Sequence, residues 1–328
     1  MTTKDRVLSA LLEEETGISG QWLAERLDVS RNAVWKAVIQ LRAEGYVIEG
    51  TSNRGYRLLS AGDRLSLPEI EKHLTAKTFG RHMEIHDRLD STNNRAREAA
   101  LEGAPHGYLV IADSQTGGKG RMGRSFFSPG HSGIYISYVL RPTLPADRAA
   151  MITSLAAVAV ARAIEEAAET DVRIKWVNDL YIGEKKVCGI LCEAAMSMEN
   201  QLLDYAVLGI GVNTAPMAFP DELREIATSV GNETGEMIPR SALIAGISNQ
   251  LEALWGQLET GEFLEESRRR SNVLGRDIFL IRGGERKEAH ALDLDDQGRL
   301  IVETAEGRET IGYGEVSLRV RKEEGDGE

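Results

Sequence analysis

Cysteine is scarce in this sequence: only Cys188 and Cys192 occur among its 328 residues. They lie close together in a segment that we expect to form a strand, and no metal-ligating partner stands at a useful spacing from them. We therefore interpret both as reduced residues of the core rather than as a disulfide or a metal site. This usage of cysteine fits a reducing cytoplasm.

Long apolar runs are absent as well. The first residues, MTTKDR, lack the hydrophobic stretch of a signal peptide, and no uninterrupted apolar run could span a bilayer. Hydrophobic residues make up 42% of the chain and charged residues 27%, the balance of an ordinary globular protein. We expect a cytoplasmic protein of two or three domains, one of them large enough for a substantial core.

The common catalytic signatures are missing too. The sequence has no evident serine triad, cluster of metal ligands or P-loop, and its six histidines occur singly or in predicted loops. Residues 117–124, GGKGRMGR, do satisfy the dinucleotide-binding pattern GxGxxG. That pattern requires a helix at the last glycine, whereas SFFSPG follows here. The sequence therefore predicts a cationic, glycine-rich loop that folds over an anionic ligand.

The net charge of −12 argues against a surface that is generally adapted to nucleic acid. The acidic excess is unevenly distributed, because residues 1–65 carry nine basic and nine acidic side chains. Within them, residues 26–57 carry six basic and three acidic side chains. A local basic face on an acidic protein is consistent with a small DNA-binding module beside an enzyme. Charge counting alone leaves scattered solvated charge as the alternative.

The first 65 residues have the pattern of a winged helix-turn-helix. A short helix is expected over 21–27 with Trp22, Leu23 and Leu27 inward, and Ser30 is a suitable N-cap for a second helix over 31–43. In this motif the second helix enters the major groove of DNA.

Two short strands around a Ser-Asn-Arg-Gly turn follow the second helix and predict the wing. A helical interaction module without a DNA role is the alternative, but the basic hairpin favours DNA binding. The candidate DNA-contacting residues are Arg31, Asn32, Trp35, Lys36, Arg54 and Arg57.

The central region is predicted to be α+β. One long helix over 146–169 lies among strands connected mainly by hairpins, which favours a mixed or antiparallel sheet over alternating βαβ units. Amide and hydroxyl groups at strand ends, together with the cationic loop, suit a polar small molecule and a phosphate. Catalysis there would depend on positioning and charge rather than on a protein nucleophile. The alternatives are that Ser91 or Thr92 only caps a helix, and that Lys186 is a solvated hairpin lysine.

From Arg276 onward, short strands separated by turns fit a small SH3-like barrel, and the acidic tail 323–328 is expected to be disordered. We place the domains at 1–65, 66–272 and 273–322, with a linker near 61–67.

Five short motifs stand out in the central region: Asp90–Asn93, Gln115–Arg121, Lys175–Asp179, Lys185–Leu191 and Gly209–Asn213. They occur in the order found in biotin–protein ligases. With the winged helix before them, they make nearly the whole chain resemble the bifunctional biotin ligases that also repress the biotin operon. Lys119 departs from the usual arginine of this family and Val177 from its usual proline; lysine keeps the charge but loses bidentate geometry.

The resemblance implies a class II synthetase-like ligase domain between the winged helix and the SH3-like domain. It also implies a reaction of two steps, in which biotin and ATP form biotinyl-5′-AMP with Mg²⁺ on the phosphates, and biotin then passes to a lysine of a carrier domain. A homodimer carrying the adenylate would bind a two-fold operator. The expected partners are thus a biotin carboxyl carrier protein domain and operator DNA, with no membrane. A ligand-sensing regulator without ligase activity and a lipoate-type ligase are the alternatives.

The resemblance also assigns residues. Lys186 and Arg121 would be catalytic, and Mg²⁺ would lie near Asp179 without a dedicated protein site. Biotin would be bound by Ser91, Thr92, Asn93, Gln115, Gly118, Lys119, Gly120, Arg121 and Lys186. The nucleotide would be bound by Arg121, Phe126, Asn178, Asp179, Asn213 and Arg319.

Overall fold

The computed structural model describes residues 1–14, 16–51, 55–145, 148–196, 202–282, 284–312 and 317–320. Arg54 and the acidic tail lie outside these ranges. The chain divides into two compact units, one formed by Met1–Thr75 with Pro239–Gly246 and the other by Ala76–Ile238 with Ile247–Glu328. No helix in the described ranges is long and apolar enough to cross a membrane.

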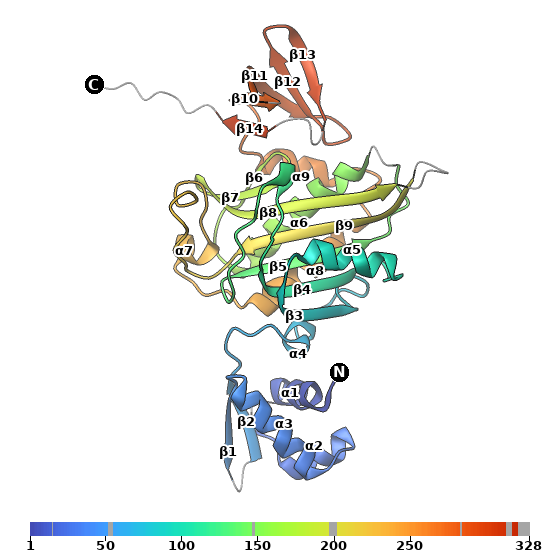
Figure 1. The fold of residues 1–328 in the computed structure, drawn as a ribbon, viewed down its shortest axis with the longest axis vertical. Helices are drawn as coiled ribbons and strands as arrows, with labels where there is room; N and C mark the ends of the chain where they lie inside the picture. Colours follow the sequence, from blue (N-terminus) through green and yellow to red (C-terminus); the bar gives the residue numbers. More distant parts are fainter. Residues whose placement is uncertain are drawn as a thin grey trace, which may run out of the picture. The chain divides into compact units, whose positions relative to one another are not determined.

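The first unit contains the predicted helix-turn-helix and hairpin (Figure 1). Its elements are α1 (Thr3–Glu13), α2 (Gly20–Leu27), α3 (Arg31–Ala43), β1 (Val47–Thr51), β2 (Gly55–Ser60) and α4 (Leu67–Glu71). Ser30 caps α3 as expected, because its hydroxyl accepts a hydrogen bond from the backbone N–H of Ala33 at 3.1 Å. Asp28 ends α2 in the left-handed conformation, which turns the chain between the two helices.

Trp22 was predicted to face inward, and that prediction is wrong. Leu23, Ala24 and Leu27 form the buried face of α2, so Trp22 falls on the neighbouring face and is 42% exposed. The guanidinium of Arg26 lies over the indole at 4.8 Å from the ring centroid. A cation on the ring accounts for a large aromatic side chain at the surface.

A seven-stranded sheet forms the centre of the second unit, in the order β3-β4-β5-β9-β8-β7-β6. The strands β3 and β4 pair in parallel and the other neighbours are antiparallel, so the predicted mixed sheet is confirmed. The strands are β3 (Met83–Leu89), β4 (Tyr108–Gln115), β5 (Gly133–Leu140), β6 (Arg173–Lys175), β7 (Asp179–Ile182), β8 (Lys185–Met196) and β9 (Leu203–Asn213).

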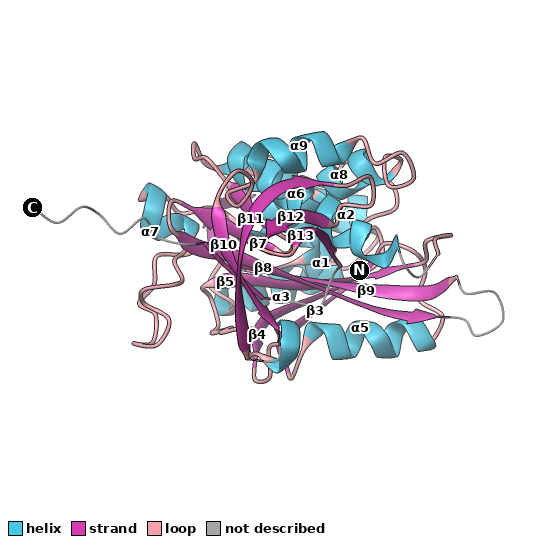
Figure 2. Cartoon of the chain, turned by 90° about the horizontal axis from the view of Figure 1, so that it is seen from above, coloured by secondary structure: helices cyan, strands magenta, loops and turns pink. Residues whose placement is uncertain are grey.

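Helices cover both faces of this sheet. Figure 2 shows α5 (Thr92–Leu101) on one face and α6 (Ala149–Ala167) with α9 (Phe263–Arg270) on the other. The alanine-rich α6 is almost wholly buried, which explains why its sequence is apolar around most of the helix. The remaining helices are α7 (Val230–Thr234) and α8 (Arg240–Trp255), whose first residues belong to the first unit.

A second, five-stranded antiparallel sheet follows, in the order β13-β12-β11-β10-β14. Trp176 and Val177 join its apolar core, and the indole Nε1 of Trp176 donates to the carbonyl of Gly298 at 3.0 Å. The strands are β10 (Asp277–Arg282), β11 (Glu285–Leu294), β12 (Leu300–Thr304), β13 (Gly307–Ile311) and β14 (Ser317–Val320).

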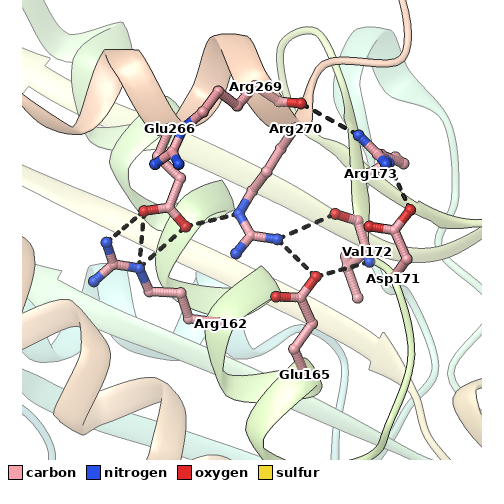
Figure 3. A network of polar contacts seen from close by, with 8 residues as sticks. All are labelled: Arg162, Glu165, Asp171, Val172, Arg173, Glu266, Arg269 and Arg270. Atoms are coloured by element: carbon pink, nitrogen blue, oxygen red, sulfur yellow. Dashed lines mark hydrogen bonds and ion pairs between the residues drawn. The ribbon is translucent and has the colours of Figure 1, made fainter.

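A network of charges fixes α9 to α6 and to the start of β6 (Figure 3). Glu266 accepts hydrogen bonds from Arg162 and, at 2.8 Å, from Nε of Arg270. Arg270 also donates to Glu165 at 2.7 Å, and Glu165 accepts the backbone N–H of Val172 at 2.9 Å. The hydrogen bond from Arg162 and the second arginine together lower the pKa of Glu266 from 4.5 to about 2.

This pKa predicts how the network responds to acid. Because the folded-state pKa lies below the ordinary value, ionised Glu266 stabilises the fold above about pH 4.5 and that contribution is lost as the pH falls towards 2. We expect Glu266→Gln to cost about 1–3 kcal/mol at pH 7 and progressively less below pH 4.5. Calorimetric melting across this range measures the difference. Glu265→Gln, on the exposed face of the same helix, is the control; an equal loss at every pH would contradict the prediction.

Candidate functional site

The start of α5 lies at a buried polar wall. Ser91, Thr92 and Asn93 are each at most 4% exposed, although their side chains are polar. The backbone N–H of Thr92 donates to Oε1 of Gln115 at 2.8 Å, which joins α5 to the end of β4. Ser91 occupies the N-cap position, but its hydroxyl forms no capping hydrogen bond. Helix capping therefore does not explain this hydroxyl.

Sequence reasoning missed two residues of this wall, Ser137 and Glu193. Oγ of Ser137 on β5 lies 2.7 Å from Oδ1 of Asn93, and Nδ2 of Asn93 donates to Glu193 on β8 at 2.8 Å. Gly209 on β9 also faces Asn93. A Cβ at this position would stand 2.0 Å from Oδ1 of Asn93, so only glycine leaves room for the amide. Ser137 could have been suspected as the one small polar residue among the apolar and aromatic residues of its strand, whereas Glu193 gave no such signal.

The glycine-rich loop forms a tight hairpin. The N–H of Gly120 donates to the carbonyl of Arg124 at 2.7 Å, around a 3₁₀ turn over Arg121–Gly123. The base of the hairpin is fixed where Phe126 N–H donates to the carbonyl of Gly118 at 2.8 Å. No helix begins after Gly123, as the sequence predicted, because the chain continues through a short bridge and an irregular stretch.

Two cations of the loop, Lys119 and Arg121, have different partners. Nζ of Lys119 donates to Oδ1 of Asn94 on α5, whose amide in turn donates to Asp90; that hydrogen bond lowers the pKa of Asp90. Nη1 of Arg121 instead donates to Oδ1 of Asn178 at 3.0 Å. Both side chains line the same small cavity, Lys119 at the α5 side and Arg121 at the Asn178 side.

Arg121 has an unused donor at the centre of the site. Its Nη2 is buried without a hydrogen-bond partner in the described part of the chain. Burial lowers the pKa of Arg121, and the charge of Asp179 opposes that effect. Asp179 forms an ion pair with Lys186 at 2.6 Å. A buried guanidinium remains charged and needs acceptors, so this arrangement favours an anionic ligand.

Phe126 lies over a floor of glycines. A Cβ on Gly211 would stand 2.5 Å from Cε1 of the ring, and one on Gly189 would stand 3.1 Å from Cε2. Nζ of Lys186 lies 5.9 Å from the ring centroid. At the end of β9, Nδ2 of Asn213 donates to the carbonyl of Thr228 at 3.0 Å.

Two cavities adjoin each other at the site and share five lining residues. The polar wall encloses about 50 Å³, and the space beyond Phe126 measures about 630 Å³. The smaller volume is far below the several hundred Å³ of ordinary ligand pockets, so a larger ligand would also extend into the adjoining space. Residues shared by both cavities are Gly120, Arg121, Phe126, Asn178 and Lys186.

The remaining predicted residues belong to the C-terminal sheet and to the winged helix. Arg319 pairs through its backbone with Phe279, but its side chain falls outside the described residues. On the winged helix, Arg57 on β2 is exposed, as predicted. The four candidates on α3 are also exposed, namely Arg31, Asn32, Trp35 and Lys36.

The chain matches known protein families over three segments. Residues 85–213 match the biotin/lipoate A/B protein ligase family, residues 3–57 an HTH domain, and residues 273–319 the biotin protein ligase C terminal domain. The biotin protein ligase from Aquifex aeolicus, solved in complex with biotin and ATP, superposes with a TM-score of 0.64 at 28% identity, covering 74% of this chain and 100% of that one. The fold and the site thus define a ligase of the biotin/lipoate class with an added helix-turn-helix.

Full-length relatives narrow this class. The bifunctional ligase/repressor BirA of Bacillus subtilis is 40% identical over 92% of this chain and 94% of its own length. The protein of the same name from Escherichia coli is 30% identical over 95% and 96%. The chain belongs to the family of bifunctional ligase/repressors.

The contact between Gly211 and Phe126 predicts the effect of an added methyl group. Gly211→Ala should displace the ring and loosen the loop, because overpacking of this kind costs about 1–3 kcal/mol. Hydrogen exchange of the amides of Gly120 and Phe126 should then be faster, by about tenfold if the cost falls on the loop alone. Gly256→Ala is the control, since a Cβ there meets nothing within 4 Å. Unchanged loop exchange in Gly211→Ala would contradict the proposed packing.

Proposed function

We propose that this protein is a biotin–protein ligase that also represses transcription in response to biotin. In the first step a carboxylate oxygen of biotin attacks the α-phosphorus of ATP; a new O–P bond forms, and pyrophosphate leaves as the old one breaks. In the second step the neutral amine of a carrier lysine attacks the acyl carbon. A C–N bond forms, AMP leaves, and the amine loses a proton to water.

The observation that carries this proposal is the unsatisfied Nη2 of Arg121 between the two cavities. Biotin's carboxylate and the α-phosphate repel each other, so they need positive charge where they meet. Arg121 and Lys186 supply that charge at the boundary, and the ion pair with Asp179 positions Lys186. Such preorganised charge stabilises the negative charge that develops in the transition state.

The polar wall suits the ureido ring of biotin, whose N–H and carbonyl groups must be satisfied once buried. We assign this contact to Ser91, Thr92, Asn93 and Gln115, and we assign the cover of the site to Gly118, Lys119 and Gly120. Lys119 donates a hydrogen bond to Asn94, so we expect it to hold the loop rather than to bind the carboxylate directly.

The larger cavity suits the nucleotide. Phe126 offers a ring for stacking, and Asn178, Asp179 and Asn213 offer polar groups, with Arg319 assigned by family resemblance. Within the described ranges no cluster of three His, Cys, Asp or Glu could hold a metal. We treat Mg²⁺ as part of the MgATP substrate, with Asp179 as its candidate carboxylate.

The regulatory half of the proposal rests on the first unit. We propose that a homodimer of this chain, favoured by the bound adenylate, places two winged helices on a two-fold operator. The domain limits proposed are 1–65, 66–272 and 273–322, with a class II synthetase-like centre and an SH3-like end. The carrier substrate is a biotin carboxyl carrier protein domain.

Lys186→Ala should reduce biotin transfer to a carrier domain by at least about a hundredfold, since it removes charge from the reacting centre. Transfer is measured as biotinylated carrier formed from biotin, ATP and Mg²⁺. Lys185→Ala is the matched control, because Lys185 donates to the backbone carbonyl of Arg224 on the surface and should be dispensable. Near-normal transfer by Lys186→Ala would overturn the catalytic assignment. No transfer by the unaltered chain would favour a ligand sensor, and transfer of lipoate instead of biotin a lipoate-type ligase.

Arg57→Ala should weaken binding to operator DNA. It should also lower the slope of log Kd against the logarithm of the salt concentration by about one, as expected for one lost phosphate contact. The measurement is a gel shift with biotin and ATP at several salt concentrations, on a duplex selected from a random library. Lys72→Ala, an exposed lysine outside the winged motif, is the control. An unchanged salt slope for Arg57→Ala would remove the wing from the interface.

A further inference from the structure

The exposed face of α3 carries two large apolar side chains. Trp35 is 52% exposed and Ile39 is 41% exposed, although the helix already has a separate apolar face in the core of the first unit. Large apolar residues that adjoin each other at a surface often mark an interaction site. The buried residues of α3 are Val34, Ala37, Val38 and Leu41.

Two rows of exposed side chains run along this face, because residues four positions apart on a helix are neighbours at its surface. The polar row contains only polar and basic residues. The apolar row begins with an arginine and continues with the two apolar residues. The apolar row is Arg31, Trp35 and Ile39, and the polar row is Asn32, Lys36 and Gln40.

The exposure of Trp35 has no local explanation of the kind found for Trp22. The guanidinium of Arg26 lies over the indole of Trp22 and accounts for its place at the surface. No such pair of a cation and a ring involves Trp35 in the described part of the chain. A partner outside the chain is therefore the natural cover for the apolar row.

The charge of α3 indicates which partner this is. The helix contains three basic residues and no acidic residue, whereas the whole chain has a net charge of −12. Arg42 donates to the carbonyl of Ile48 at 2.8 Å, while Arg31 and Lys36 stand beside the apolar residues. Residues 3–57 also match an HTH domain. A face of this charge in this motif fits the phosphates and the major groove of a DNA duplex.

The chemistry of the groove explains why the row is apolar. Among the four bases, thymine alone presents a methyl group in the major groove, and apolar side chains recognise it by contact. Trp35 and Ile39 are separated by about 6 Å along the helix axis. That distance is close to two base-pair steps of about 3.4 Å each. The apolar row thus fits two thymines about two steps apart.

We propose that Trp35 and Ile39 determine part of the operator specificity by contacting the methyl groups of two thymines in each half-site. The inference rests on the proposed repressor function and names the chemical group that the repressor reads. Removing one methyl group from water changes the affinity about fourfold. A two-fold operator repeats each contact, so the loss of one symmetry-related pair of methyl groups should weaken binding about tenfold to twentyfold.

The competing occupant of this face is a second copy of the chain. Trp35 and Ile39 would then stabilise an assembly, and their removal would weaken binding to every duplex alike. Only direct contact with thymine makes the effect of these side chains depend on one methyl group of the DNA.

The test uses a duplex selected from a random library with the full chain, biotin and MgATP. Symmetry-related thymidines are replaced in pairs, one position at a time, by deoxyuridine, which lacks the methyl group and keeps the same hydrogen-bonding edges. Fluorescence anisotropy gives Kd for each duplex. We expect Kd to rise about tenfold to twentyfold at two positions of the half-site. The other thymidines are internal controls and should change Kd by less than about twofold.

Alanine variants connect each position to its side chain. Ile39→Ala should abolish the effect of deoxyuridine at one sensitive position and Trp35→Ala at the other, because the side chain that contacts the methyl group is gone. The ratio of the two Kd values, for the deoxyuridine and thymidine duplexes, should fall below about two. Ile39→Val keeps a branched apolar side chain and should retain most of the ratio. Gln40→Ala, in the polar row, is the matched control and should retain all of it.

Two results would overturn the inference: no thymidine position sensitive to deoxyuridine in the unaltered chain, or an undiminished ratio in either alanine variant. An undiminished ratio together with weaker self-association in sedimentation would assign the face to a second copy of the chain. Matching circular dichroism and melting temperatures establish that each variant is folded. Failure to select any duplex is a different outcome, because it overturns the repressor half of the proposed function itself.

Discussion

The segment 176–179 connects three parts of the second unit, namely the five-stranded sheet, the central sheet and the glycine-rich loop. Trp176 packs into the five-stranded sheet and donates to Gly298, whereas Asn178 accepts from Arg121 and Asp179 pairs with Lys186. The charge network of α6 and α9 fixes β6, the strand that precedes this segment (Figure 3). The position of both candidate catalytic cations therefore depends on packing far from the ligand.

Two cations lie close to one carboxylate at the boundary of the two cavities, since Arg121 and Lys186 line both of them and Asp179 pairs with Lys186. Lys186 is neutralised by Asp179, while Arg121 is left with a neutral amide and an unused donor. Burying such a donor costs free energy, which an acceptor on a ligand would recover. The unpartnered guanidinium nitrogen therefore favours a ligand that brings an acceptor to this point.

The sequence predicted the elements better than their contacts. Hydrophobic periodicity located the helix-turn-helix, the long helix α6 and the hairpins, since each has a clear local pattern. Periodicity wrongly placed Trp22 in the core. The guanidinium of Arg26 lies over its ring at the surface, and a hydrophobic pattern carries no information about such a cation–π pair. Ser137 and Glu193 were missed for a related reason: their partner Asn93 lies 44 and 100 positions away, so only the folded sheet brings them together.

The glycines of β9 show how a local pattern and a distant contact combine. Gly209 and Gly211 alternate along the strand and so lie on the same face of the sheet. One leaves room for the amide of Asn93 and the other for the ring of Phe126. The spacing of two was visible in the sequence, but the two neighbours that require it come from α5 and from the loop. A methyl group would therefore meet a different part of the site at each position: Asn93 of the polar wall at position 209, and the ring of Phe126 at position 211.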